Sequence, residues 1–334
     1  MDWLGPLVLS WQDRSIRSLS QRWSSSLSSV QAHYVATVVV STLSEALLFA
    51  LFVGLYYAMR ALPSAIYDVP GDEYRQVALA HANATMATEA LAGLLLEKRW
   101  QDGAIGNKAL MDFLAVFYKF GLWAVIGSFH VWVLLFRSTS YAVLRNGFWL
   151  TTLLSGAFVL LWPVAPPRLT PGAGVVDTIV AVSGWSNPTV GPYDSCPSLH
   201  FSWSLIVCFG TLHFLGSADG GGGGGRGGGG GAGGGWGGGA GGGARSGSAG
   251  KSALGCAAVL YPALTLYAVV VTGNHWLADV MLGAFFVALG FILSRLPPFR
   301  HCCEYHDYHM IAFYQQADSV SPAYQVDSTA FPEF

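Results

Sequence analysis

Charged residues are scarce in this sequence of 334 amino acids. Lysine, arginine, aspartate and glutamate together make up 11% of the chain, whereas hydrophobic residues make up 52%. A soluble domain carries about a quarter charged residues, so this chain has too little charge to cover a surface that faces water. Together with a mean hydropathy of +0.44, this excludes a soluble globular protein and predicts a membrane protein. The formal net charge of −2 gives no indication of a nucleic-acid partner.

Cysteine is also rare, and the five cysteines lie at scattered positions that form neither a disulfide framework nor a metal-ligand spacing. Glycine is frequent in one place only, because 23 of the 42 glycines lie within residues 216–250. Such a segment has almost no side chains to pack, so we predict a disordered, flexible linker there. We find no carboxylate cluster that suggests a divalent metal, and we predict no cofactor.

Six mostly apolar stretches predict transmembrane helices, each of which needs about 20 residues to cross a membrane. They cover residues 36–59, 111–136, 148–164, 199–215, 254–272 and 276–293. The apolar stretch 87–96 is too short to cross and predicts an amphipathic or interfacial helix. The predicted fold class is therefore all-α, a polytopic membrane protein whose six or so transmembrane helices form a bundle.

The predicted spans divide the chain into four parts. These are a cytosolic N-terminal segment (1–35), the first transmembrane helix with a lumenal loop (36–110), a membrane domain (111–295) interrupted by the glycine-rich linker, and a cytosolic tail (296–334). Basic residues are more numerous on the side of the termini, ten against six, which predicts cytosolic termini. The sequon at Asn83 would then be lumenal, and we expect an endomembrane location, in the Golgi or the ER. In the tail, Cys302 and Cys303 are either palmitoylated or free thiols.

Three polar segments lie at the ends of predicted spans. Arg168 follows the third span, His200 begins the fourth, and His275 lies between the fifth and the sixth. In a six-span chain these positions share one membrane face, whichever way the protein is inserted. Arginine donates a fork of hydrogen bonds to phosphate oxygens. One histidine can attack phosphorus while the other protonates the leaving oxygen. The three residues together therefore predict a site that binds and transfers a phosphoryl group.

Other residues near these segments are candidates for the same site. Asp279 lies one helical turn after His275, where its carboxylate can hold the imidazole tautomer. Ser198 precedes a helix start, which favours an anion. Asn274 is close enough in sequence to touch substrate. Lys119, within the second span, is a further possible phosphate ligand, although a lysine that snorkels to the membrane interface explains it better.

These residues resemble the motifs of the type 2 phosphatidic acid phosphatase superfamily, which are Lys-x6-Arg-Pro, Pro-Ser-Gly-His and Ser-Arg-x5-His-x3-Asp. The sequence Pro-Ser-Leu-His that ends at His200 is similar to the second motif, with Leu199 in place of glycine. His275 and Asp279 match the end of the third motif. Ala-Pro-Pro-Arg at Arg168 and Thr-Gly-Asn-His at His275 resemble the inositolphosphotransferase branch, related to fungal inositol phosphorylceramide synthase. The resemblance covers about 111–293.

The resemblance implies a role for each residue. His275 would be the nucleophile that forms a phosphohistidine, and His200 would act first as an acid and then as a base. Asp279 would orient His275, and Arg168 would bind phosphate. The implied substrate is a lipid phosphate within the bilayer, and the reaction needs no metal.

Two cations of the family pattern are missing. Val269 stands where the third motif has its arginine, and no lysine precedes Arg168 at the spacing of the first motif. A phosphodiester carries one charge and a phosphomonoester nearly two, so fewer cations favour head-group transfer, for example from phosphatidylinositol to ceramide. Two alternatives stay open. One is a lipid phosphate phosphatase, which would use the same residues with water as acceptor, and the other is a non-catalytic membrane protein that retains the fold.

Overall fold

The predicted fold class is confirmed by a computed structural model, which describes residues 14–22, 29–66, 73–136, 138–178, 193–217 and 245–296. This part of the chain is nearly all helical, and its only β-type pairing is an isolated bridge between Val164 and Asp194. The elements are α2 (Ser29–Ile66), α3 (Glu73–Leu91), α4 (Glu97–Ala104), α5 (Lys108–Val116), the π-helical turn η1 (Phe117–Gly121), α6 (Leu122–Phe136), α7 (Ser138–Leu161), the 3-10 turn η2 (Pro167–Leu169), α9 (Leu199–Ser217), α10 (Arg245–Val271) and α11 (Leu277–Ser294).

Within the residues that the structure describes, six helices or continuous helical segments are long and apolar enough to cross a membrane, so the protein is an integral membrane protein. They cover Thr42–Leu62, Lys108–Leu134, Val143–Leu161, Leu199–Gly216, Gly250–Val271 and Leu277–Ser294. Backbone N–H and C=O groups find no hydrogen-bond partners in the hydrocarbon core, whereas a helix pairs these groups with one another. The first predicted span, 36–59, begins before the candidate span at Thr42, although α2 itself starts still earlier, at Ser29, and has 38 residues. At 1.5 Å per residue it is about 57 Å long, nearly twice the thickness of the hydrocarbon core.

The predicted helix at 87–96 is wrong in its bounds. The helix at this place is α3, which begins at Glu73 and ends at Leu91. Gly93 follows with φ of 70°, a left-handed conformation that ends helices and that glycine adopts without strain. The three leucines Leu94–Leu96 therefore leave the helix and lead into α4.

Helices overlap both ends of the predicted glycine-rich linker, 216–250. Helix α9 continues to Ser217, and α10 begins at Arg245, within the predicted linker. The added helical residues 245–250 extend a long helix, and extension costs far less than nucleation. Residues 218–244 of the predicted linker lie outside the described residues, as do 1–13 of the N-terminal segment and the tail from 297 onward with Cys302 and Cys303.

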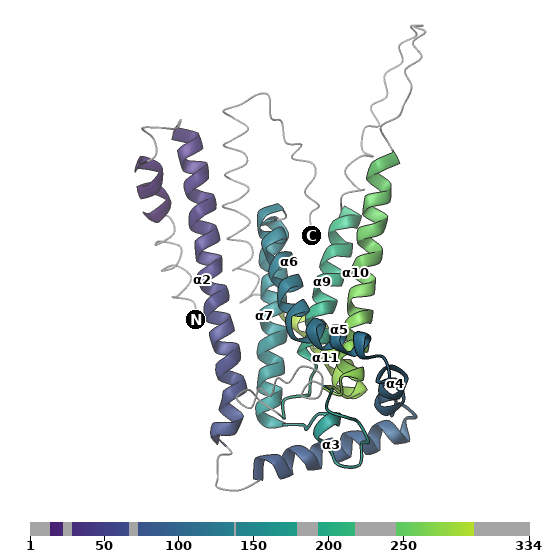
Figure 1. Cartoon of the computed structure of the whole chain (residues 1–334). Helices are drawn as coiled ribbons and strands as arrows, with labels where there is room; N and C mark the ends of the chain where they lie inside the picture. The colour runs from purple at the N-terminus through teal and green to yellow at the C-terminus, as the bar shows by residue number, and fades with distance from the viewer. Residues whose placement is uncertain are drawn as a thin grey trace, which may run out of the picture.

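Helices α3 and α4 cover one end of the bundle (Figure 1), and we call this the site end. Gln101 of α4 joins this cover to the bundle, because its Nε2 donates to the carbonyl of Val271 at the end of α10, at 3.0 Å. The same amide donates to the carbonyl of Val176 and accepts from its N–H, at 2.9 and 2.7 Å. The chain after η2 and the end of α10 are therefore held by one buried side chain.

Helix α11 packs closely against α7 and α9 through glycines. A Cβ atom at Gly290 would lie 2.4 Å from Thr151 Oγ1 of α7, and one at Gly283 would lie 2.7 Å from the carbonyl oxygen of Ser198. Small residues let membrane helices approach in this way. The close approach fixes the start of α11, and with it His275, against the start of α9.

Candidate functional site

His275 lies between α10 and α11 with one ring nitrogen held by the backbone. Its Nδ1 is 2.6 Å from the carbonyl oxygen of Ser195. A carbonyl can only accept, so this contact puts the proton on Nδ1 and leaves the lone pair on Nε2. Nε2 is buried and has no hydrogen-bond partner within the described residues. A buried polar atom without a partner calls for an explanation. The lone pair on Nε2 is therefore available to a bound ligand.

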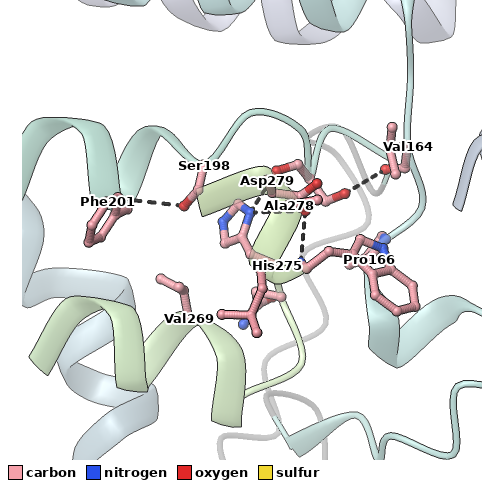
Figure 2. A network of polar contacts seen from close by, with 12 residues as sticks. Val164, Pro166, Ser198, Phe201, Val269, His275, Ala278 and Asp279 are labelled. Carbon is pink, nitrogen blue, oxygen red and sulfur yellow. Dashed lines mark hydrogen bonds and ion pairs between the residues drawn. The ribbon is translucent and has the colours of Figure 1, made fainter. Parts of the chain in front are cut away.

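Asp279 contributes to both the helix start and the histidine. Its Oδ2 accepts the N–H of Trp276 at 2.9 Å, which caps α11, and lies 3.7 Å from Nδ1 of His275. Figure 2 shows these contacts around the start of α11. The prediction that Asp279 holds the tautomer needs refinement, because the Ser195 carbonyl is the nearer partner of Nδ1. The carboxylate supplies a negative charge beside the ring.

His200 lies in the first turn of α9 and faces His275. The two imidazole rings are 5.8 Å apart between their centroids. His200 also stacks on Tyr118, with centroids 4.1 Å apart and planes 17° from parallel, and the Tyr118 ring lies 6.4 Å from that of His275. Tyr118 belongs to η1, a π-helical turn within the second span. Such turns occur often at functional sites, and this one presents an aromatic ring that fixes the orientation of His200.

Arg168 is positioned by residues from two other segments. Its Nε donates to Asn274 Oδ1 at 3.0 Å, and its Nη1 donates to Asp177 at 2.8 Å. Its backbone N–H donates to the carbonyl of Gly273, also at 3.0 Å. Asn274 is in turn held by Thr272, to whose Oγ1 it donates at 2.7 Å. Asn274, predicted to touch substrate, therefore also aligns Arg168 with the segment that carries His275.

The two remaining candidates, Ser198 and Lys119, occupy different environments. Ser198 is fully buried, and its hydroxyl accepts the N–H of Phe201 at 3.4 Å as the cap of α9. Its own N–H donates to the carbonyl of Asp279 at 2.9 Å, which joins the starts of α9 and α11. Lys119 follows Tyr118 in η1 and is half-buried. The phosphate-binding roles of both residues stay predictions.

Two buried acids complete the start of α11, and the sequence reasoning missed them. Glu97 of α4 accepts the N–H of Leu277 at 2.9 Å, and Glu89 of α3 accepts the N–H of Ala278 at 2.6 Å. Together with Asp279, three carboxyl groups thus cap three successive N–H groups. The only sequence signal was that Glu89 lies within the short apolar stretch 87–96 and that Glu97 directly follows it.

The acid cluster holds a proton at neutral pH. Burial raises the pKa of Glu89 to about 8, and the nearby carboxyl groups of Glu97 and Asp279 add to the rise, against the lowering effect of the Ala278 N–H. Glu89 is therefore mostly neutral at pH 7. Burial also raises the pKa of the Cys196 thiol well above its usual range, and Asp279 adds to this, so Cys196 is a neutral thiol.

Three ionisable residues within the spans have structural partners. Arg145 of α7 pairs with Glu45 of α2 at 2.5 Å, and Glu45 also accepts from Tyr141 at 3.1 Å. His130 Nδ1 lies 2.9 Å from the carbonyl of Ile126 within its own helix. In the described ranges, no group of three or more histidine, cysteine, aspartate or glutamate side chains is arranged to hold a metal ion.

Comparison with known proteins supports the class of chemistry that this geometry suggests. Residues 83–218 match the family model described as the PAP2 superfamily. The match includes Arg168 and His200 and ends before His275. No match was found among curated proteins or among solved structures. An integral membrane protein with this match is expected to be a phosphatase or phosphotransferase that acts on lipid phosphates.

Proposed function

We propose that the protein is a membrane enzyme that transfers a phosphoryl-linked head group between lipids through a phosphohistidine at His275. The observation that carries this proposal is the buried, unpartnered Nε2 of His275 beside the ring of His200. Arg168, aligned by Asn274, supplies a guanidinium for the phosphate oxygens. The inositolphosphotransferase-like reaction, from phosphatidylinositol to ceramide, is the specific form that we propose.

In the first step, Nε2 of His275 attacks the phosphorus of the donor diester, and the bond from phosphorus to the diacylglycerol oxygen breaks. His200 gives its proton to that oxygen, so the leaving group departs as an alcohol. The imidazole of His275 becomes positively charged, and Asp279 at 3.7 Å from Nδ1 stabilises this charge. The Ser195 carbonyl keeps the Nδ1 proton in place.

In the second step, His200 takes the proton of the acceptor hydroxyl, and the acceptor oxygen attacks the phosphohistidine. The bond from phosphorus to His275 breaks, and the ring returns to its neutral form. Each histidine ends in its starting protonation state. The same residues would hydrolyse the intermediate if water reached it, which is the phosphatase alternative.

Head-group transfer and hydrolysis can be separated with purified protein in lipid vesicles. We would supply phosphatidylinositol labelled in its head group together with ceramide, and separately labelled phosphatidic acid, with His275→Ala as the blank. Label transferred to ceramide supports the transferase, and phosphate released from phosphatidic acid supports the phosphatase. No turnover of either lipid, with protein that is folded, would favour the non-catalytic alternative.

The covalent intermediate distinguishes the same two activities by its decay. Rapid quenching without acid, after mixing with donor lipid labelled at phosphorus, should trap label that is acid-labile and base-stable. Ceramide should discharge this label faster than water does if the enzyme is a transferase. Equal rates would identify a phosphatase.

We further propose that the site end faces the lumen of the Golgi or the ER and that the termini are cytosolic. This follows from the distribution of basic residues and from the exposed Asn83 of the sequon on α3. In a variant whose five native cysteines are replaced by serine, a cysteine introduced at the exposed position Thr88 should react with an impermeant maleimide in sealed microsomes only after detergent is added. Reaction before detergent would reverse the proposed orientation.

A further inference from the structure

Arg60 is a cation that belongs to none of the family motifs. It lies near the end of α2, and its side chain is 27% exposed. Its Nη1 donates to the hydroxyl of Tyr56, one turn earlier, at 3.0 Å. Helix α2 precedes the segment that matches the family model, so Arg60 comes from outside the matched region.

The partner of Arg60 is joined directly to the support of the nucleophile. The guanidinium of Arg60 forms an ion pair through Nε with Asp194, whose side chain is 14% exposed. Asp194 is followed by Ser195, whose carbonyl holds His275. The Ser195 hydroxyl and N–H both donate to the carbonyl of Val164, at 3.0 and 3.3 Å, which fixes this segment. Arg60 is therefore anchored one residue away from the contact that orients His275.

Arg60 and Arg168 both interact electrostatically with Tyr118, the aromatic ring that stacks on His200. Arg60 interacts electrostatically with His200 and with Tyr118, and Arg168 also interacts with Tyr118. Tyr118 stacks on His200 at 4.1 Å, and His200 faces His275 with 5.8 Å between the ring centroids, so these rings form one group. Arg60 comes from α2 and Arg168 from η2, so they reach this group from separate elements.

We propose that Arg60 is a second phosphate-binding residue, with Asp194 as its positioning residue, an inference that rests on the proposed function. The arrangement is the counterpart of Arg168, which Asp177 and Asn274 position. Hydrogen bonds within the described ranges use Nε and Nη1 of Arg60 and leave the Nη2 donors for a ligand. A phosphate oxygen on Nη2 would complete a charge-assisted hydrogen bond without displacing Asp194.

This role supplies one of the two cations that are missing from the family motifs. Val269, at the place of the motif arginine, is fully buried, and its carbonyl accepts the N–H groups of Asn274 and His275 at 3.1 and 3.2 Å. Because valine is uncharged, α10 supplies no cation for a phosphate at this position. Arg60 and Arg168 together carry two positive charges, and Asp194 and Asp177 balance them. A monoanionic diester then adds one negative charge to a neutral set, which suits a phosphodiester better than a phosphomonoester.

The test compares Arg60→Gln, Asp194→Asn and the double variant in full-length protein. KM and kcat are measured with labelled phosphatidylinositol, and binding of inorganic phosphate is measured by calorimetry in detergent. Arg60→Gln should raise KM and weaken phosphate binding by about 10- to 100-fold, the range for a lost charged hydrogen bond. Asp194→Asn should cause a smaller loss of the same kind, and the double variant should be as defective as Arg60→Gln. Lys98→Gln, an exposed cation on α4, is the matched control and should match wild type.

A purely structural ion pair predicts a different pattern. Each single variant would then be impaired by the charge left unpaired, and the double variant would recover wild-type KM and phosphate binding. That recovery would overturn the proposal, as would wild-type values in Arg60→Gln. If Arg60→Gln does not fold, the double variant, which leaves no unpaired charge, decides between the two. Phosphate binding that depends on Arg60 without turnover of any lipid would refute the proposed function alone, whereas turnover that is independent of Arg60 would refute this inference alone.

Discussion

Replacing Asp279 by asparagine isolates the charge that the mechanism requires beside His275. Asparagine has nearly the same size, and its side-chain oxygen can still accept the N–H of Trp276, which caps α11. The Ser195 carbonyl would still hold Nδ1 of His275. The variant therefore keeps the orientation of the ring and removes only the negative charge 3.7 Å from it.

The size of the effect follows from this distance. Two unit charges 3.7 Å apart interact by about 4 kcal/mol at an effective dielectric constant of about 20. The positive charge on His275 develops only as Nε2 bonds to phosphorus, so the loss falls on the transition state. We expect kcat to fall by about 10²- to 10³-fold, less than on removal of the nucleophile, and KM to change by less than about threefold.

The assay is steady-state turnover of labelled phosphatidylinositol, with Asp112→Asn as the control. Asp112 is 42% exposed and forms an i,i+4 pair with Lys108, a contact worth only about 0.5 kcal/mol. This control should leave kcat at its wild-type value. If Asp279→Asn also kept kcat within about threefold of wild type, the carboxylate would have no electrostatic role and the Ser195 carbonyl alone would serve His275.

Three further predictions test other parts of the structure. His275→Ala and His200→Ala should each abolish turnover of labelled lipid while expression and the elution volume in detergent stay normal, and wild-type activity in either would contradict the assigned role. Shortening residues 220–243 to a Gly-Ser tether should leave kcat within about twofold of wild type, because loop closure depends weakly on length; a large loss with normal expression would show that this segment binds something. The melting temperature in detergent should fall as pH rises from about 5 to 8, because the folded-state pKa of Glu89, about 8, exceeds its ordinary value of 4.5. The free energy that protonated Glu89 contributes to stability is lost as its proton leaves. Glu89→Gln should flatten this dependence of the melting temperature on pH, and an unchanged dependence would mean that Glu89 is already ionised.

The fold was predictable because the membrane limits the choices. Each span needs about 20 apolar residues, and six such stretches stand out against a sequence that is poor in charge. The same count places Arg168, His200 and His275 at one face, and the structure brings these three segments together through the start of α11 and η2. Helix ends such as Ser29 of α2 were not predictable, because a helix can extend beyond its apolar core into polar sequence.

The rest of the site leaves little trace in the sequence. The closest partner of His275 is a backbone carbonyl, that of Ser195, and any residue type could supply it. Tyr118 is one aromatic among many in an apolar span, so nothing marks it before the π-helical turn places it on His200. The motifs could not point to Arg60, because they place a lysine just before Arg168, whereas Arg60 lies on a helix about a hundred residues earlier.

The stereochemical course at phosphorus tests the central claim, that His275 attacks phosphorus itself. A donor phosphodiester made chiral at phosphorus, with sulfur in place of one oxygen, is converted by the purified enzyme, and the configuration of the product is determined. Two successive in-line displacements, the first by Nε2 of His275 and the second by the acceptor hydroxyl, predict retention of configuration. Inversion would mean one direct displacement, and His275 would then be a general base that activates the acceptor.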